Sequence, residues 1–228
     1  MTHLNIGSLI FDDLDQVDLT GPHEVLSRQP DSTWKIYAKT MAPARDMKGL
    51  RILPDATLDE APQLDVLHLP GGFGVDAMMT DRTVLRWIRR QAMGAQAVFT
   101  VCTGALLLGA TGLLRGRRAT THWASHHLLP LFGAIPVNER VVEDEKFITA
   151  AGVTSGFDGA LHLAAKLRGV AVAQGIQLYM QYDPRPPFNA GSPETAPAEL
   201  VASTRAAMAS VIAQREALAT RIAQDLPR

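Results

Sequence analysis

The stretch "FTVCTGALLLGATG", residues 99–112, decides the fold, because an apolar segment ends at a cysteine and a helix-like segment follows without a linker. The residues that lead into it, "AQAVFTVC" (95–102), are almost continuously apolar, which predicts a buried strand. The Leu- and Ala-rich residues from Thr103 onward favour a helix. The passage therefore predicts a strand that turns directly into a helix at Cys102.

The same order of strand, turn and helix occurs earlier in the chain. The segment "LDVLHLPGGFG" (64–74) predicts a buried strand that ends in a glycine-rich turn, and residues 81–92 repeat their apolar side chains at helical spacing. Further strands are predicted at 4–11, 33–39 and 50–58. Alternating strands and helices imply right-handed crossovers. We therefore expect an α/β fold, a three-layer sandwich with a mostly parallel central sheet, of the flavodoxin-like or glutamine-amidotransferase-like kind.

The remaining segments are expected to belong to the same single domain, residues 1–228. The segment "HEVLSRQ" predicts a helix, with Thr20 as its N-cap and Pro22 in its first turn. A hairpin is predicted over 139–152, and two helices packed on the core are predicted over 155–169 and 171–182. The proline-rich residues 183–198 predict an extended arm, and residues 199–225 predict a C-terminal helix.

Composition excludes several classes of protein. The 228 residues are 46% hydrophobic and 20% charged, and the net charge of −1 gives no basic face for nucleic acid. A single cysteine excludes an intrachain disulfide and a cage of several cysteines around a metal. No secretory signal and no uncharged apolar run of about 18 to 20 residues is visible. We expect a cytoplasmic protein with no nucleic-acid or membrane partner.

Cys102 has the surroundings of a nucleophile. A thiol displayed where a strand turns into a helix needs small neighbours two residues away, and here these are Gly104 and, as a weaker match, Thr100. The start of a helix favours the thiolate, and its free amides, Thr103 in particular, can bind an anion that develops on a substrate. The alternative is that Cys102 is a small buried hydrophobic residue, as free cysteines often are.

The expected acid–base partner of the thiol is Asp18. The segment "DQVDLTGP" places this carboxylate after the first strand, at the same carboxyl-end edge of the sheet as Cys102. The turn at Pro70–Gly72 also opens on that edge, where its glycines allow a substrate to approach the backbone. Asp18 has an alternative role in helix capping. The cluster His122, His126 and His127 leaves a metal site as another alternative, but no carboxylate ligand accompanies it, so no metal is expected.

Five segments together resemble the ThiJ/PfpI superfamily, within the glutamine-amidotransferase-like folds. They are "DLTGPHEVL", "LPGGFG", "TVCTGALLLGATGLL", "RATTHWASHHLL" and "NERVVEDEKFITAAGVTSGFD". Many members of the superfamily carry a glutamate as the acidic partner and a histidine after the cysteine. This chain has Asp18 and Thr103 instead, which resembles the isocyanide hydratase subgroup, as does the arm "PPFNAGSPETAP".

The resemblance implies a role for each site residue. Cys102 would be the nucleophile, Asp18 the general acid and base, and Thr103 a backbone donor. Gly71, Gly72, Gly152 and Val153 are expected to lie at the substrate pocket. The implied reaction hydrates an isocyanide to an N-substituted formamide through a thioimidate on Cys102, without cofactor, in a homodimer whose active site lies near the interface.

Two other classes of function stay open from the sequence. Similar domains occur in transcription regulators as ligand sensors, although the residues after the arm are too few for a helix-turn-helix pair. Another cysteine-dependent activity of the superfamily, such as glyoxalase-like chemistry or protection against redox stress, would use the same thiol.

Overall fold

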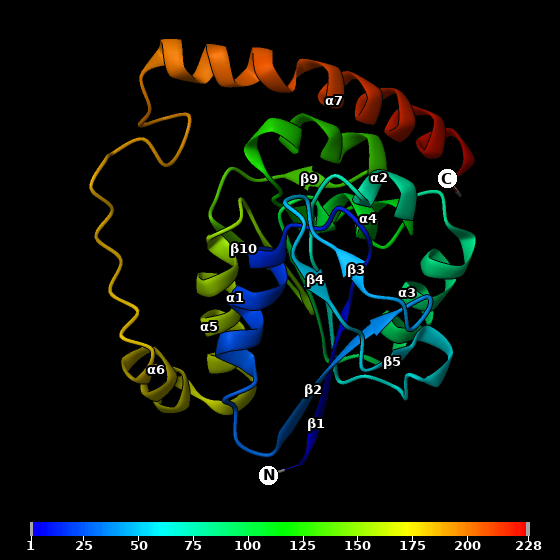
Figure 1. Ribbon diagram of the computed structural model, residues 1–228, viewed down its shortest axis with the longest axis vertical. Coiled ribbons are helices and arrows are strands. Elements are labelled where there is room, and N and C mark those ends of the chain that lie inside the picture. Colours follow the sequence, from blue (N-terminus) through cyan, green and yellow to red (C-terminus); the bar gives the residue numbers. More distant parts are fainter. Residues whose placement is uncertain (1, 227–228) are drawn as a thin grey trace.

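A seven-stranded sheet forms the centre of the computed structural model, which describes residues 2–226 (Figure 1). Its strand order is β10-β11-β7-β6-β1-β2-β5, and every neighbouring pair is parallel except the β10–β11 hairpin. The strands are β1 (Leu4–Leu9), β2 (Ser32–Ala38), β5 (Ala56–Thr57), β6 (Val66–Leu69), β7 (Ala97–Val101), β10 (Val141–Asp144) and β11 (Phe147–Ala150). The mostly parallel sheet and the predicted hairpin are confirmed.

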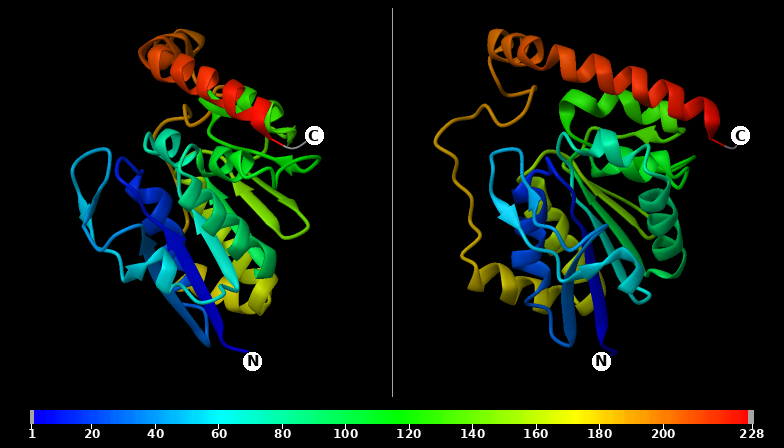
Figure 2. Two further views of the ribbon diagram at one scale, coloured as in Figure 1. Left: turned by 90° about the vertical axis from the view of Figure 1, so that its right-hand side faces the viewer. Right: turned by 45° about the vertical axis from the view of Figure 1, so that its right-hand side comes forward.

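The two faces of the sheet pack against separate groups of helices, as the alternation of side chains along a strand requires. On β7, Val98 belongs to the core that contains α3 (Arg82–Gly94) and α4 (Gly104–Ala110). Its neighbour Phe99 belongs to the other core, with α1 (Gln16–Leu26) and α5 (Ser155–Arg168). Figure 2 shows the helices on both sides of the sheet. The expected three-layer α/β sandwich is therefore confirmed.

Helix α1 begins earlier than predicted. Asp15 is its N-cap, because the Asp15 carboxylate accepts a hydrogen bond of 3.0 Å from the Val17 amide. Thr20 lies inside the helix and bonds to the side chain of Gln16, so the predicted cap is wrong. Pro22 lies in the helix interior rather than in the first turn. Asp18 consequently occupies the first turn itself.

Two other predictions need correction. The strand expected at 50–58 is divided into β4 (Arg51–Ile52) and β5, because Pro54 between them has no N–H to donate to a neighbouring strand. Strand β4 pairs instead with β3 (Ala44–Arg45) in a separate sheet. Helix α6 (Val170–Tyr179) is not packed on the core along its length. It buries only Ala173 and Ile176, and its last turn is exposed.

The C-terminal helix α7 (Ala198–Asp225) crosses one end of the molecule, far from α6 (Figures 1 and 2). Residues 183–197, which join the two helices, contain no helix or strand. Helix α7 packs on the 3-10 segment η2 (Trp123–Phe132), and Leu218, Ala219 and Ile222 extend the core there. The remaining short elements are α2 (Val75–Met78), η1 (Leu58–Glu60), β8 (Arg118–Ala119) and β9 (Ile135–Pro136). Within residues 2–226, no helix is both long and apolar enough to cross a membrane.

Candidate active site

Cys102 lies on the sharp turn between β7 and α4 that the sequence predicts. Its φ of 55° is in the left-handed region, which strains a residue with a side chain by about 1 to 3 kcal/mol. The turn is held because the Cys102 amide donates to the Ala150 carbonyl at 3.0 Å and the Cys102 carbonyl accepts from the Thr121 hydroxyl at 2.7 Å. Gly104 is required beside it, since a Cβ there would lie 2.2 Å from the Leu69 carbonyl oxygen.

The thiol of Cys102 is buried, with 7% of the residue exposed. Burial raises its pKa well above the usual value, and the nearby Asp18 carboxylate raises it further. The Thr103 amide acts in the opposite direction and favours the thiolate, as the sequence suggests, but burial outweighs it. Cys102 is therefore a neutral thiol at neutral pH.

Asp18 is fully buried at the same edge of the sheet, and its environment keeps it protonated. Burial, together with the charge of Asp15, raises its pKa to about 8. The Gly71 amide donates to Asp18 Oδ2 at 2.9 Å, and a side-chain interaction with the Cys102 thiol also favours the ionised form, but neither overcomes burial. Among the described residues, Oδ1 has no hydrogen-bond partner. The site therefore holds a carboxylic acid beside a thiol, and one oxygen of that acid, Oδ1, is left without a hydrogen bond to the described residues.

The glycine turn after β6 brings Asp18 and Thr103 together. A Cβ on Gly71 would lie 2.6 Å from the Thr103 amide nitrogen and 2.8 Å from Asp18 Oδ2, so only glycine fits between them. The Gly72 amide donates to the Thr103 hydroxyl at 3.0 Å, and that hydroxyl donates back to the Gly72 carbonyl at 3.1 Å. The amides of Gly71 and Gly72 are thus engaged by side chains of the site itself.

Behind Asp18 lies a histidine whose contribution the sequence did not indicate. Pro22 has no N–H, so the main-chain carbonyl of Asp18 lacks the donor that an α-helix normally supplies four residues later. The ring of His68 approaches this carbonyl, and its Nδ1 lies 2.6 Å from the Ser8 hydroxyl. Complete burial lowers the pKa of His68 to about 3, so the ring is neutral.

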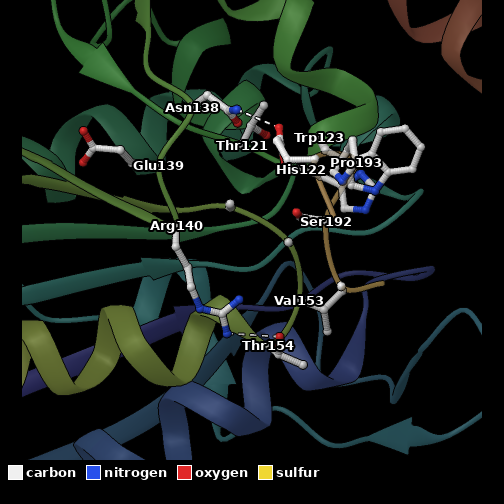
Figure 3. Close-up of a pocket in the computed structure, with 14 residues that line it drawn as sticks. Thr121, His122, Trp123, Asn138, Glu139, Arg140, Val153, Thr154, Ser192 and Pro193 are labelled. Atoms are coloured by element: carbon white, nitrogen blue, oxygen red, sulfur yellow. Dashed lines mark hydrogen bonds between the residues drawn. The ribbon is translucent and has the colours of Figure 1, made fainter. Parts of the chain in front are cut away.

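A cavity of about 520 Å³ (Figure 3) is lined in part by Thr121, whose hydroxyl donates to the Cys102 carbonyl. Thr121, Gly152 and Val153 line it from the side of the sheet, and Ser192 and Pro193 of the arm line it from the other side. Cys102 and Asp18 do not line this cavity themselves, but Thr121 is bonded directly to the Cys102 carbonyl. Of the four predicted substrate-binding residues, Gly152 and Val153 therefore border open space, whereas Gly71 and Gly72 lie in the buried turn.

The histidine cluster does not assemble a metal site. His122 caps η2 by accepting a hydrogen bond from the Ala124 amide, and burial lowers its pKa to about 4. The Nε2 atom of His126 is hydrogen-bonded to the Val137 carbonyl at 3.1 Å. In residues 2–226, no group of three or more His, Cys, Asp or Glu side chains could hold a metal ion.

Arg215 is a second residue that the sequence reasoning missed. It lies on α7 but reaches the glycine turn, where its guanidinium donates to the Gly72 carbonyl at 3.2 Å. A signal for it exists in the sequence, because Arg215 interrupts the apolar stripe of α7 three residues before Leu218 and seven before Ile222. A charged side chain at such a position is buried only when it has partners.

Comparisons with known proteins agree with this architecture. A family model described as "DJ-1/PfpI family" matches residues 5–166. An isonitrile hydratase of Pseudomonas putida is 47% identical over 223 residues, which cover 98% of each chain. The crystal structure of a ThiJ/PfpI family protein from Pseudomonas syringae superposes with a TM-score of 0.94 at 40% identity, covering 96% of this chain and 91% of that one.

A more distant neighbour shares the fold alone. The structure of Drosophila melanogaster DJ-1beta superposes with a TM-score of 0.70 at 21% identity, and it covers 79% of this chain and 98% of its own. The family model spans the sheet, the glycine turn and the cysteine turn. This chain belongs to the DJ-1/PfpI family.

Proposed function

We propose that this chain hydrates isonitriles (isocyanides) to N-substituted formamides, with Cys102 as the nucleophile and Asp18 as the proton-transfer group. One observation carries the proposal: a buried thiol adjoins a buried, protonated carboxyl group whose Oδ1 has no partner among the described residues. The terminal carbon of an isonitrile must gain both a proton and a nucleophile, so it needs this pair of groups. The likeness to a curated isonitrile hydratase supports the choice of substrate.

In the first step, Asp18 transfers its proton to the isonitrile carbon and Cys102 Sγ forms a bond to the same carbon. The thiol proton passes to the carboxyl group, so Asp18 ends the step as it began it. The product is a thioimidate, R–N=CH–S–Cys102, which equals isonitrile plus thiol in atoms and charge. A carboxyl group with a pKa of about 8 is suited to this exchange, because it both gives and takes a proton near neutral pH.

In the second step, water attacks the thioimidate carbon. Asp18 accepts a proton from the water and delivers one to the imidate nitrogen. The carbon–sulfur bond then breaks while the proton of the new hydroxyl group passes to Sγ, which releases R–NH–CHO and returns Cys102 as the thiol. Covalent catalysis of this kind divides one difficult hydration into two easier steps.

Thr103 and the cavity would serve this chemistry. The Thr103 amide stabilises negative charge on Sγ, which develops as the carbon–sulfur bond forms or breaks. The cavity beside Gly152 and Val153 is the place for the R group, and Thr121 connects its wall to the cysteine turn. Its lining combines polar side chains, such as Asn138 and Arg140, with apolar ones, such as Trp123, Val153 and Pro193 (Figure 3).

The test is an assay of cyclohexyl isocyanide with the wild type, Cys102→Ser and the control Met93→Ala, whose side chain is exposed. Formation of N-cyclohexylformamide by the wild type and the control, with none by Cys102→Ser, is expected. Intact-protein mass spectrometry after a rapid quench is expected to show one added isocyanide on the wild type and on Met93→Ala, and none on Cys102→Ser. Turnover by Cys102→Ser would contradict the covalent route, and turnover of methylglyoxal but not of the isocyanide would contradict the substrate class.

The proposed enzyme acts as a homodimer. Leu178 and Tyr179, neighbours on the last turn of α6, each expose more than three quarters of their surface, at 82% and 76%. Apolar side chains gathered on one element in this way are typical of contact surfaces. Light scattering on the purified protein is expected to give twice the mass of one chain, and Leu178→Glu is expected to lower that mass. A single-chain mass for the wild type would contradict the dimer.

A further inference from the structure

Arg215 is a buried cation that α7 inserts between three other segments. Only 4% of the residue is exposed. Its Nε donates to Asp76 Oδ1 at 2.6 Å, its Nη2 donates to the Gly72 carbonyl at 3.2 Å, and its Nη1 donates to the Ser125 hydroxyl at 3.4 Å. Arginine suits this place because its planar group holds several acceptors in fixed directions at once.

The acceptor on the glycine turn connects Arg215 to the site. The Gly72 carbonyl that receives Nη2 also receives the Thr103 hydroxyl, and the adjoining Gly71 amide binds Asp18. Asp18 and Thr103, two of the three proposed functional residues, are therefore held by the same Gly71–Gly72 turn that Arg215 contacts. A shift of this turn would move the Asp18 carboxyl group and the Thr103 amide together.

The segment that supplies Arg215 lies outside the part of the chain that the family model matches, which ends at residue 166. The DJ-1beta structure is covered to 98% of its own length, yet it accounts for 79% of this chain. The ThiJ/PfpI neighbour from Pseudomonas syringae covers 96% of this chain and so extends into α7. The contact between Arg215 and the Gly72 carbonyl is therefore made by a C-terminal segment that extends beyond the part of the fold that the family model matches.

We propose that Arg215 is a positioning residue of the active site, which locks the Gly71–Gly72 turn against Thr103 and places a fixed positive charge behind Cys102. The C-terminal helix α7 thus contributes a residue to the active site of the same chain. The proposal depends on the proposed role of Cys102 as nucleophile for its kinetic consequence, but the charge effect on the thiol can be measured without any substrate.

Electrostatics support the geometry. The Arg215 charge lowers the pKa of Cys102, and it opposes the carboxylates of Asp18 and Asp15, which raise it. The same charge adds to the effect of burial in lowering the pKa of His122, the N-cap of η2. Asp76 is the charged partner of the guanidinium itself.

Two substitutions separate the charge of Arg215 from its fixed geometry. Arg215→Gln removes both, and Arg215→Lys retains the charge but cannot hold Asp76 and the Gly72 carbonyl in the same directions. Leu218→Ala is the control, because Leu218 anchors the same helix through apolar packing alone. The measurements are the rate of Cys102 alkylation by iodoacetamide from pH 6 to 10, kcat and KM for cyclohexyl isocyanide, and Tm.

For Arg215→Gln we expect slower alkylation, with its pH midpoint moved upward, and a fall in kcat of roughly tenfold or more with little change in KM. For Arg215→Lys we expect an alkylation profile near that of the wild type but a kcat that stays low. Leu218→Ala is expected to lower Tm and leave both the profile and kcat near the wild type. Asp76→Asn, which leaves the cation in place but frees the guanidinium, is expected to resemble Arg215→Lys and replaces Arg215→Gln if that variant does not fold.

The proposal is overturned if Arg215→Gln lowers Tm like Leu218→Ala while keeping the wild-type kcat and alkylation profile, or if Asp76→Asn, used in its place, lowers Tm while keeping the wild-type kcat. Arg215 would then be an anchor for α7 and nothing more. If the wild type does not hydrate isonitriles, the alkylation profiles still decide the charge effect. Failure of the proposed reaction and failure of this inference therefore give different results.

Discussion

The Asp18 carboxyl group and the Gly71 amide are joined by a buried hydrogen bond of 2.9 Å, although 53 residues separate them in the chain. The bond fixes the first turn of α1 to the end of β6. It favours the ionised carboxylate, yet burial is the larger effect and raises the pKa of Asp18 to about 8. Keeping the buried Asp18 carboxyl group therefore lowers the stability of the folded protein near neutral pH, but it provides the site with a protonated acid.

Asp18→Asn is expected to stabilise the protein at high pH and to abolish turnover. The native state retains a proton on Asp18 that the unfolded chain releases above a pKa of 3.8, so stability decreases as the pH rises from about 4 to 8. At about 1.4 kcal/mol per pKa unit, the cost at pH 8 is of the order of several kcal/mol. Asparagine keeps the acceptor for Gly71 without this cost. Tm of both proteins at pH 4.5 and pH 8 tests this, and an equal gain at both values would contradict it.

Gly104→Ala is expected to destabilise the fold strongly. Its Cβ would lie 2.2 Å from the Leu69 carbonyl oxygen, and this contact with main chain cannot be relieved by a side-chain rotation. Gly175→Ala in α6 is the matched control. It meets nothing within 4 Å and is expected to stabilise its helix by about 0.5 to 1 kcal/mol. Urea unfolding of both variants measures the difference, and similar midpoints would show that the elbow tolerates a side chain.

Thr103→Val is expected to loosen the site, because it retains the shape of the side chain but removes its hydroxyl. The Gly72 amide and carbonyl then both lose a buried partner, at a cost of about 1 to 3 kcal/mol. Thr103→Ser retains the hydroxyl and is expected to keep most of the stability and turnover. Tm and kcat of the two variants test this, and equal losses in both would point to the methyl group instead.

Acid is expected to destabilise the protein through His68. Burial lowers the pKa of His68 to about 3, so as the pH falls below 6.5 the unfolded chain binds a proton that the native protein does not. The stability that depends on neutral His68 is present above pH 6.5 and is lost between pH 6.5 and 3. The double variant Ser8→Ala and His68→Leu removes this titration and both hydrogen-bonding groups.

The unfolding free energy of that double variant is expected to depend less on pH between 6.5 and 4, by as much as about 1.4 kcal/mol per pH unit. Above pH 7 the slopes of the variant and the wild type are expected to agree, because His68 is neutral there in both the native and the unfolded chain. Unchanged slopes in the acid range would show that other groups carry the acid sensitivity.

The sheet and the cysteine turn were predictable because their signals are local. Apolar runs such as 95–102 specify a strand by themselves, and glycine at 104 next to Cys102 indicates the turn between strand and helix. The start of α1 was harder to predict. Thr20 and Pro22 together are typical of a helix start, whereas Asp15 caps the helix and the proline lies in its interior.

The contacts that complete the site were not predictable, because they join residues that are distant in the chain. Arg215 and Gly72 are 143 residues apart, and only the packing of α7 on η2 brings them together. His68 lies in a strand and gives no sign that it approaches the carbonyl freed by Pro22. The protonated state of Asp18 likewise follows from its complete burial. The sequence around Asp18 does not show that this carboxyl group is buried.

The irregular arm has a consequence for the covalent integrity of the molecule. Phe188 lies in the middle of it with 78% of its surface exposed, so chymotrypsin should cleave the native chain there. The larger fragment would carry Cys102 and Asp18, and the smaller one Arg215. If the guanidinium and the apolar side chains of α7 hold the fragments together, the nicked protein is a reconstitutable two-piece system into which a synthetic helix can be exchanged.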